Sequence, residues 1–130
     1  MSNQQQSDAL VLFGATGDLA YKKTFPALMT LLESGKLDLP VVGVGRSAWG
    51  RDQLIERARN SLNEYGDGVD ERLFAQLAER LDYVSGDYRD RATYSRIKEK
   101  LAGALSPAYY LAIPPFLFGP VIQQLGDADL

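Results

Sequence analysis

The chain has 130 residues, of which 45% are hydrophobic and 24% are charged, and its formal net charge is −3. These values are typical of one globular domain, and the mild acidity gives no sign of a nucleic-acid or anionic-membrane partner. Cysteine and histidine are both missing, which excludes disulfides, thiol catalysis, an imidazole base and two common metal ligands from this chain. We therefore expect a cytoplasmic protein with no metal site. We also expect no signal peptide or transmembrane helix, because no stretch approaches about 20 apolar residues.

The first part of the chain predicts a flexible arm, a buried strand and a helix. Residues 1–8 are polar, and the folded domain is expected over residues 9–130. Residues 9–13 are wholly apolar, as in a strand covered on both faces of a parallel sheet. A helical pattern follows over residues 17–33, where Pro26 is expected to kink or restart the helix. Its expected buried stripe is Leu19, Leu28, Leu31 and Leu32, with Gly35 as the C-terminal cap.

The middle of the chain predicts two further strands with two helices between them. The sequence PVVGVG at residues 40–45 is a second apolar strand. Asp52 is the expected N-cap of a helix over residues 53–64, and a second helix is expected over residues 71–80. Residues 81–85 form a third strand, which is less apolar and therefore expected near an edge of the sheet.

The last part predicts a helix, a fourth strand and a short final helix. The helix is expected over residues 92–104 and the strand over residues 108–113, ended by the proline pair that follows. The final segment, FLFGPVIQQL, resembles a short helix with a break at Gly119 and Pro120. The resulting order, β-α-β-α-α-β-α-β-α, predicts a Rossmann-like, doubly wound parallel sheet with strand order 3-2-1-4. Four strands are fewer than the usual six, so we expect this chain to be the first part of a longer protein.

A small-residue loop joins the first strand to the first helix. The loop is Gly14, Ala15, Thr16 and Gly17, and it lies where a dinucleotide-binding fold holds its phosphates. Glycine allows the backbone to approach the pyrophosphate, and the helix start offers N–H groups with a partial positive charge. Ala20 is small enough for close packing of helix and strand, which gives the pattern G-x-x-G-x-x-A.

The loop has two other interpretations. A glycine turn can serve only to pack a helix against a strand, although here strand, loop and helix follow in the order that the dinucleotide fingerprint requires. A mononucleotide-type phosphate loop is disfavoured because no Gly-Lys-Ser/Thr sequence follows Gly17.

The end of the second strand indicates which dinucleotide is preferred. NAD-binding folds usually place an acid there for the ribose 2′-hydroxyl, whereas this chain has Arg46 and Ser47. A guanidinium fork and a hydroxyl suit a 2′-phosphate, so the sequence predicts NADP. The alternative is that Arg46 is a solvated surface residue.

Four blocks of the sequence resemble the glucose-6-phosphate dehydrogenase family. They are GATGDLAYKK at residues 14–23, VGVGRS at residues 42–47, GDYRDRATYSRIKEKL at residues 86–101 and YYLAIPP at residues 109–115. The blocks occur in order over nearly the whole chain, and the string Gly-x-x-Gly-Asp-Leu-Ala is far more specific than a generic glycine loop. The family often has three basic residues after the alanine, whereas this chain has Tyr21, Lys22 and Lys23.

The resemblance implies a role for each matched residue. The residues implied to cradle the pyrophosphate of NADP through their backbone are Gly14, Ala15, Thr16, Gly17, Asp18 and Leu19. Arg46 and Ser47 would hold the 2′-phosphate, and Asp87 and Tyr88 would lie beside the adenosine. On the fourth-strand side the cofactor would be bordered by Tyr110, Ala112 and Pro114. Lys23 matches a lysine near both the nicotinamide and the sugar phosphate, although a solvated surface lysine is the alternative.

The resemblance also implies a reaction, which is the oxidation of D-glucose 6-phosphate to 6-phosphogluconolactone with NADP in the pentose phosphate pathway. In the family a histidine is the general base, so a chain without histidine contains no catalytic residue and is expected to be inactive alone. A truncated sheet would also favour self-association.

Two other functions were left open by the sequence. One is a non-catalytic NADP-binding or sensor domain. The other is half of a short-chain reductase or epimerase, a class that can also begin Gly-Ala-Thr-Gly. Tyr94 and Lys98 have the Tyr-x-x-x-Lys spacing of that second class. Their helix precedes the fourth strand, however, which is too early in the chain for the catalytic role.

Overall fold

The computed structural model describes residues 7–130, so most of the predicted arm, residues 1–6, lies outside the described residues. Asp8, at the end of the predicted arm, is well anchored. Its two carboxylate oxygens accept hydrogen bonds from the backbone N–H groups of Leu105 (2.7 Å) and Ser106 (2.9 Å). These bonds lower the pKa of Asp8, and they hold this residue, just before β1, beside the last strand of the sheet.

The core of the fold is a four-stranded parallel sheet. Its strands are β1 (Ala9–Phe13), β2 (Val41–Gly45), β3 (Leu81–Ser85) and β4 (Pro107–Leu111). The strand order is β3-β2-β1-β4, which confirms the predicted topology and the edge position of the third strand. β1 and β2 are central and almost entirely apolar because both of their faces are covered by helices.

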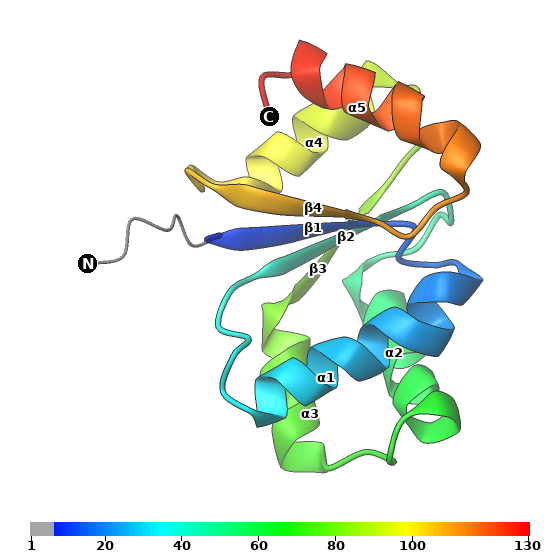
Figure 1. Ribbon diagram of the computed structural model, residues 1–130, viewed down its shortest axis with the longest axis vertical. Coiled ribbons are helices and arrows are strands. Elements are labelled where there is room, and N and C mark those ends of the chain that lie inside the picture. The colour runs from blue at the N-terminus through cyan, green and yellow to red at the C-terminus, as the bar shows by residue number, and fades with distance from the viewer. Residues whose placement is uncertain (1–6) are drawn as a thin grey trace.

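Helices cover both faces of the sheet, as Figure 1 shows. On one face lie the π-helical turn η1 (Ala20–Thr24), α1 (Phe25–Glu33), α2 (Arg51–Tyr65) and α3 (Glu71–Arg80). On the other face lie α4 (Arg91–Leu101) and α5 (Phe118–Asp127), the latter preceded by the 3₁₀ turn η2 (Pro115–Leu117). This arrangement confirms the doubly wound α/β class. The connections from β1 to β2 and from β2 to β3 lie on one face of the sheet, and the connection from β3 to β4 lies on the other.

Successive side chains of β1 point to opposite faces of the sheet, and the core is accordingly divided into two clusters. Leu12 faces α1, α2 and α3, where it joins Phe25, Leu54 and Leu77 in one apolar cluster. Val11 and Phe13, with their neighbours on the other face, join the side chains of α4 and α5 in a second cluster. The sheet is therefore packed on both sides, and its strand ends are held at fixed positions.

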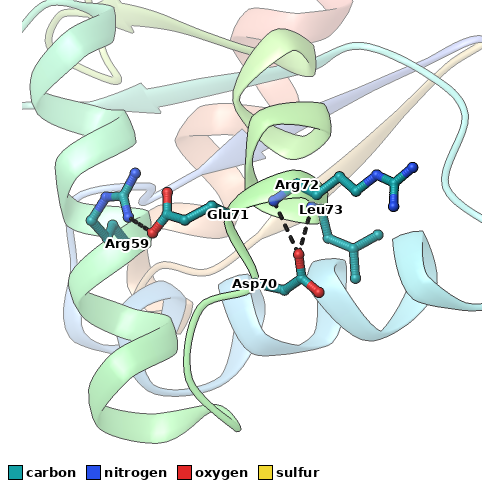
Figure 2. Close-up of polar contacts among 5 residues, drawn as sticks. All are labelled: Arg59, Asp70, Glu71, Arg72 and Leu73. Carbon is teal, nitrogen blue, oxygen red and sulfur yellow. Dashed lines mark hydrogen bonds and ion pairs between the residues drawn. The ribbon is translucent and has the colours of Figure 1, made fainter.

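Two helix starts depend on local capping. Asp70 precedes α3, and its Oδ1 accepts from the N–H groups of Arg72 (3.0 Å) and Leu73 (3.3 Å), as Figure 2 shows. The prediction that Asp52 caps α2 is wrong. Gly50 is the N-cap residue, its N–H donates to Oε1 of Gln53 (2.7 Å), and Asp52 lies in the first helical turn.

Three other details of the helices differ from the prediction. α4 ends at Leu101 rather than at residue 104, because Ala102 takes a left-handed conformation (φ 47°) and ends the helix. α5 runs through Gly119 and Pro120 without a break, because Pro120 lies in the first turn, where its missing N–H is not needed. Leu19 and Leu31, expected in the buried stripe, are 44% and 40% exposed.

The first helix begins at Asp18 and changes register before Pro26, as a π-helical turn followed by α1. Gly35 follows α1 with φ +73°, and its N–H donates to the Leu32 carbonyl, which confirms the predicted cap. No helix within residues 7–130 is long and apolar enough to cross a bilayer. Cytoplasmic location and self-association stay predictions.

Candidate functional site

The carboxyl ends of the four parallel strands form one edge of the sheet, at the right in Figure 1. Phe13, the last residue of β1, is in register with Val44 on β2 and Leu111 on β4, and Gly45 pairs with Ser85 on β3. The loops that follow these strands therefore start side by side. In doubly wound sheets ligands bind at this edge, where the direction of the crossovers changes, which here is between β1 and β4.

Gly14 brings the β1 loop into direct contact with the segment after β4. Its φ is +84°, and a Cβ atom at this position would lie 2.1 Å from the Ala112 carbonyl oxygen. The N–H groups of Gly14 and Ala15 both donate to the Val44 carbonyl, at 2.9 and 3.0 Å. Ala15 is fully buried. These two residues consequently shape the loop and have no backbone donor left for a ligand.

Backbone donors are still available at the start of the helix. The Gly17 N–H closes a turn onto the Gly14 carbonyl, and Tyr21 makes the first helical bond, to the Gly17 carbonyl. The N–H groups of Asp18 and Leu19 precede that bond, so they point out of the helix start with its partial positive charge. Both side chains are exposed, and the Asp18 carboxylate is placed in solvent at the first turn, where an acid stabilises the helix.

Arg57, which the sequence did not single out, holds this helix start from the side. Its Nη2 donates to the Gly17 carbonyl (3.3 Å), and its guanidinium lies 4.3 Å from the centre of the Tyr21 ring. Arg57 belongs to α2, 40 residues away in the sequence. Only the folded structure brings its positive charge beside the glycine loop, so local sequence patterns gave no signal for it.

Arg46 and Ser47 directly follow β2 at the same edge. Arg46 is exposed and, within residues 7–130, forms no ion pair. Its guanidinium is close enough to the Tyr88 hydroxyl to lower the pKa of that phenol, although burial raises the pKa of Tyr88 overall. Ser47 is partly buried. An uncompensated guanidinium next to the glycine loop is a suitable partner for a phosphate.

Gly45 and Tyr83 explain how the loops fit together. A Cβ on Gly45 would lie 2.7 Å from Oγ1 of Thr16 and 2.8 Å from the hydroxyl of Tyr83. The space beside Gly45 is therefore filled by one hydroxyl from the β1 loop and one from β3. The Tyr83 hydroxyl also donates to the Ser47 carbonyl (2.7 Å). Tyr83 was not predicted, because a tyrosine within a half-buried strand is usually a core residue.

Asp87 and Tyr88 follow β3, and their placement limits how they can meet a ligand. The Asp87 carboxylate accepts from the Arg89 N–H (2.8 Å), which stabilises the turn that leads into α4. Tyr88 is only 5% exposed, and its ring packs edge-on against Phe13 with ring centres 6.0 Å apart. The Tyr88 ring is thus part of the core, and its buried hydroxyl donates to the Val44 carbonyl (3.5 Å), so of these two residues only Asp87 is exposed.

The predicted residues on the β4 side fall into two groups. Ala112 is buried against Gly14, and Pro114 is exposed at the start of η2, so both belong to the edge that carries the glycine loop. Tyr110 and Lys23 instead share a mainly apolar groove of about 480 Å³ between α1 and β4. Leu10, near the amino end of β1, also lines the groove, so the groove runs along the helix rather than only at the strand ends.

The pair Tyr94 and Lys98 does not form a catalytic pair. Tyr94 is fully buried, and its hydroxyl donates to the Tyr88 carbonyl (2.7 Å). Lys98 is exposed and donates to the Ala128 carbonyl (3.1 Å). Both side chains have structural partners, so the arrangement gives no support to a short-chain reductase.

The topology and the loop geometry together define a Rossmann-like α/β domain. Gly14 and Gly45 let the loops at this edge pack closely together, the helix start offers donors, and Arg46 supplies positive charge, so the residues present fit a phosphate-bearing dinucleotide. The family model for "Glucose-6-phosphate dehydrogenase, NAD binding domain" matches residues 11–130. The chain belongs to the glucose-6-phosphate dehydrogenase family, in the part that this model covers.

Comparison with known proteins gives the same result. The chain is 41% identical over 124 residues to a glucose-6-phosphate 1-dehydrogenase of Mycobacterium bovis, covering 95% of this chain and 26% of the relative. It is 34% identical over 134 residues to that of Dickeya dadantii, covering 100% of this chain and 27% of the relative. The chain thus spans about a quarter of the length of these relatives.

The fold also matches solved structures. A crystal structure of glucose-6-phosphate 1-dehydrogenase from Mycobacterium avium superposes with a TM-score of 0.90 at 45% identity, over 96% of this chain and 28% of that one. A glucose-6-phosphate dehydrogenase in complex with its substrate glucose 6-phosphate matches with a TM-score of 0.83 at 28% identity, over 98% of this chain and 29% of that one.

Proposed function

We propose that this chain binds NADP and forms the cofactor-binding part of a glucose-6-phosphate dehydrogenase, which oxidises D-glucose 6-phosphate to 6-phosphogluconolactone. The observation that carries the choice of NADP is Arg46, whose exposed guanidinium follows β2 where NAD-binding folds usually have an acid. Family membership and the relatives' names support the reaction.

We assign each proposed cofactor contact by the hydrogen-bond donors and the charge that the residue provides. The N–H groups of Asp18 and Leu19 and the hydroxyl of Thr16 would bind the pyrophosphate. Arg46, with Ser47, would bind the 2′-phosphate through charge-assisted hydrogen bonds. When bound, the nicotinamide supplies the hydride acceptor, whereas the residues of this chain bind and orient the cofactor.

Titration of both dinucleotides with an Arg46→Ala variant tests the proposal. The single tryptophan, Trp49, lies in the loop after Ser47 and provides a fluorescence signal. We expect Arg46→Ala to weaken NADP binding by about 10- to 150-fold, which corresponds to about 1.5–3 kcal/mol, and to leave NAD binding nearly unchanged.

A matched control removes the positive charge of an arginine that lies away from the proposed site. Arg72 is exposed on α3, and Arg72→Ala should leave both affinities unchanged because its side chain lies far from the strand ends. If Arg46→Ala keeps the wild-type affinity for NADP, Arg46 does not bind the 2′-phosphate and the preference for NADP loses its basis.

A non-catalytic NADP-binding or sensor domain is the second candidate. It would use the same NADP site to change a contact with a partner instead of to transfer hydride. Both candidates predict that the chain alone produces no NADPH from glucose 6-phosphate. They are distinguished by adding the rest of a family member's chain, which should restore turnover for the dehydrogenase and leave a sensor inactive.

A further inference from the structure

The loop that carries Arg46 is held on both sides of that residue. On one side, the Gly45 carbonyl accepts a hydrogen bond from the Gly86 N–H (2.9 Å). On the other side, the Ser47 carbonyl accepts two, from the Tyr83 hydroxyl and from the Trp49 N–H, both at 2.7 Å. The backbone of Arg46 is therefore fixed while its side chain remains exposed to solvent.

Of these three bonds, only the one from Tyr83 comes from a side chain, and it links separate parts of the fold. Tyr83 lies on β3 and is 6% exposed. Its hydroxyl also lies beside Thr16, at the position that a Gly45 side chain would occupy. One phenolic oxygen thus meets the glycine loop and the Arg46 loop, which are the two proposed phosphate-binding segments.

The hydroxyl of Tyr83 is a reliable hydrogen-bond donor. Burial raises its pKa to about 12, so the phenol keeps its proton at any pH near neutrality. A buried, protonated hydroxyl with a backbone carbonyl at 2.7 Å has one well-defined orientation.

We propose that Tyr83 is a positioning residue that sets the preference for NADP over NAD by fixing the Arg46 loop through the Ser47 carbonyl. This inference rests on the proposed function, because it assumes that Arg46 binds the 2′-phosphate. Without the phenolic hydroxyl, the loop keeps the Trp49 bond and the Gly86 bond at Gly45, but Ser47 loses its bond to β3. Arg46 then samples positions away from the phosphate, and the affinity falls in proportion to the fraction of molecules still competent to bind.

The test is a double-mutant cycle of Tyr83→Phe and Arg46→Ala, with NADP and NAD each titrated against the full chain. Tyr83→Phe should weaken NADP binding by about three- to tenfold and change NAD binding by less than twofold, because NAD has no 2′-phosphate. In the Arg46→Ala background, Tyr83→Phe should have no further effect on NADP binding, since the group that it positions is already gone.

Tyr94→Phe is the matched control. Tyr94 is also buried, its pKa is also about 12, and its hydroxyl also donates to a backbone carbonyl at 2.7 Å, but that carbonyl belongs to Tyr88. Tyr94→Phe should leave the ratio of the two affinities at the wild-type value. An equal loss of NADP and NAD affinity in Tyr83→Phe, or no loss at all, would overturn the inference.

A second measurement needs no cofactor. Because the Trp49 N–H shares the Ser47 carbonyl with Tyr83, loosening of the loop should increase the mobility of Trp49, measured by time-resolved fluorescence anisotropy. We expect the increase in Tyr83→Phe and not in Tyr94→Phe, and unchanged mobility in Tyr83→Phe would overturn the inference. If mobility increases but Arg46→Ala binds NADP as well as the wild type, the assignment of Arg46 is wrong, and the positioning role for NADP is overturned with it.

Discussion

Gly14 is the residue on which the geometry of the loop depends most directly. Its φ of +84° is unfavourable for any residue with a side chain, and a Cβ would lie 2.1 Å from the Ala112 carbonyl oxygen. We predict that Gly14→Ala lowers the free energy of unfolding by about 3 kcal/mol or more, because backbone strain and a clash with backbone atoms add together. Urea unfolding followed by circular dichroism measures this change.

Gly35 provides the control that separates strain from contact. Its φ is +73°, but nothing lies within 4 Å of the position that a Cβ would take. Gly35→Ala should therefore cost only the backbone term, about 1–2 kcal/mol. Equal losses for the two variants would show that the approach of Gly14 to Ala112 contributes nothing to stability.

The contrast between Gly14 and Tyr83 shows what the sequence predicts at the scale of single residues. Gly14 was recognisable because the strand, the loop and the helix that define its role are contiguous in the sequence. The role of Tyr83 depends on Thr16 and Ser47, which are distant along the chain and meet it only when β1, β2 and β3 align. The same holds for Arg57 and Gly17.

The π-helical turn η1 is explained by a proline and a serine acting together. In π register the carbonyl of Tyr21 would accept from residue 26, but Pro26 has no N–H. The hydroxyl of Ser61, which is fully buried on α2, donates to the Tyr21 carbonyl instead. Ser61 thus supplies the hydrogen bond that Pro26 cannot make.

We predict that Ser61→Ala destabilises the protein by about 1–3 kcal/mol, since a buried carbonyl loses its partner. In a Pro26→Ala background, residue 26 has an N–H, so Ser61→Ala should cost clearly less. The free energies of unfolding of the four proteins in this cycle provide the measurement. Additive losses would mean that Ser61 does not compensate for Pro26.

The start of α3 gives a pH-dependent prediction. Glu71 accepts from Nη1 of Arg59 (2.6 Å), as Figure 2 shows, and this bond lowers the pKa of the Glu71 carboxyl. A group whose pKa is lower in the folded state stabilises the protein above its unfolded pKa, about 4.3, and loses that contribution as the pH falls. Wild type should therefore be slightly more stable than Glu71→Gln at neutral pH.

Unfolding experiments at a series of pH values check this expectation. The difference between wild type and Glu71→Gln should shrink as the pH falls below about 4.3 and through the lowered pKa of the folded state. The effect is small because both side chains are on the surface and solvent screens the pair. A difference that grows toward acid pH would contradict the direction of the pKa shift.

The helices and strands were largely predictable, and two of the errors lie at helix ends that lack a typical capping residue. α3 was predicted from residue 71 to residue 80, because a helical apolar pattern is a local signal. The start of α2 was missed because Gln53 bonds back to Gly50 without a capping acid. The end of α4 was missed because Ala102 adopts a left-handed conformation that its residue type does not favour.

At the scale of the whole molecule, the proposed site is formed by segments that are far apart in the sequence. The glycine loop follows β1, the Arg46 loop follows β2, and the two segments that complete the edge follow β3 and β4. The β1 strand also contributes to both core clusters, through Leu12 on one face and Phe13 on the other. A ligand at this edge therefore contacts segments whose positions depend on the entire sheet.

Binding there should raise the stability of the entire domain and not only of one loop. A ligand at about 100 times its dissociation constant stabilises the native state by about 2.7 kcal/mol, which raises the unfolding temperature of a domain of this size by about 10 °C. We predict a shift of this kind with NADP. At the same concentration, NAD should give a shift of about half that size or less, because an affinity at least tenfold weaker leaves about 1.4 kcal/mol at most.

Thermal unfolding of wild type and Arg46→Ala with each dinucleotide measures both shifts. In Arg46→Ala the shift with NADP should fall to the size of the shift with NAD, since the two ligands differ only in the phosphate that Arg46 is proposed to bind. An equal shift with both dinucleotides in the wild type would show that the site does not recognise the 2′-phosphate. A large NADP shift that survives in Arg46→Ala would mean that another basic residue at this edge, such as Arg57 beside the glycine loop, provides the recognition.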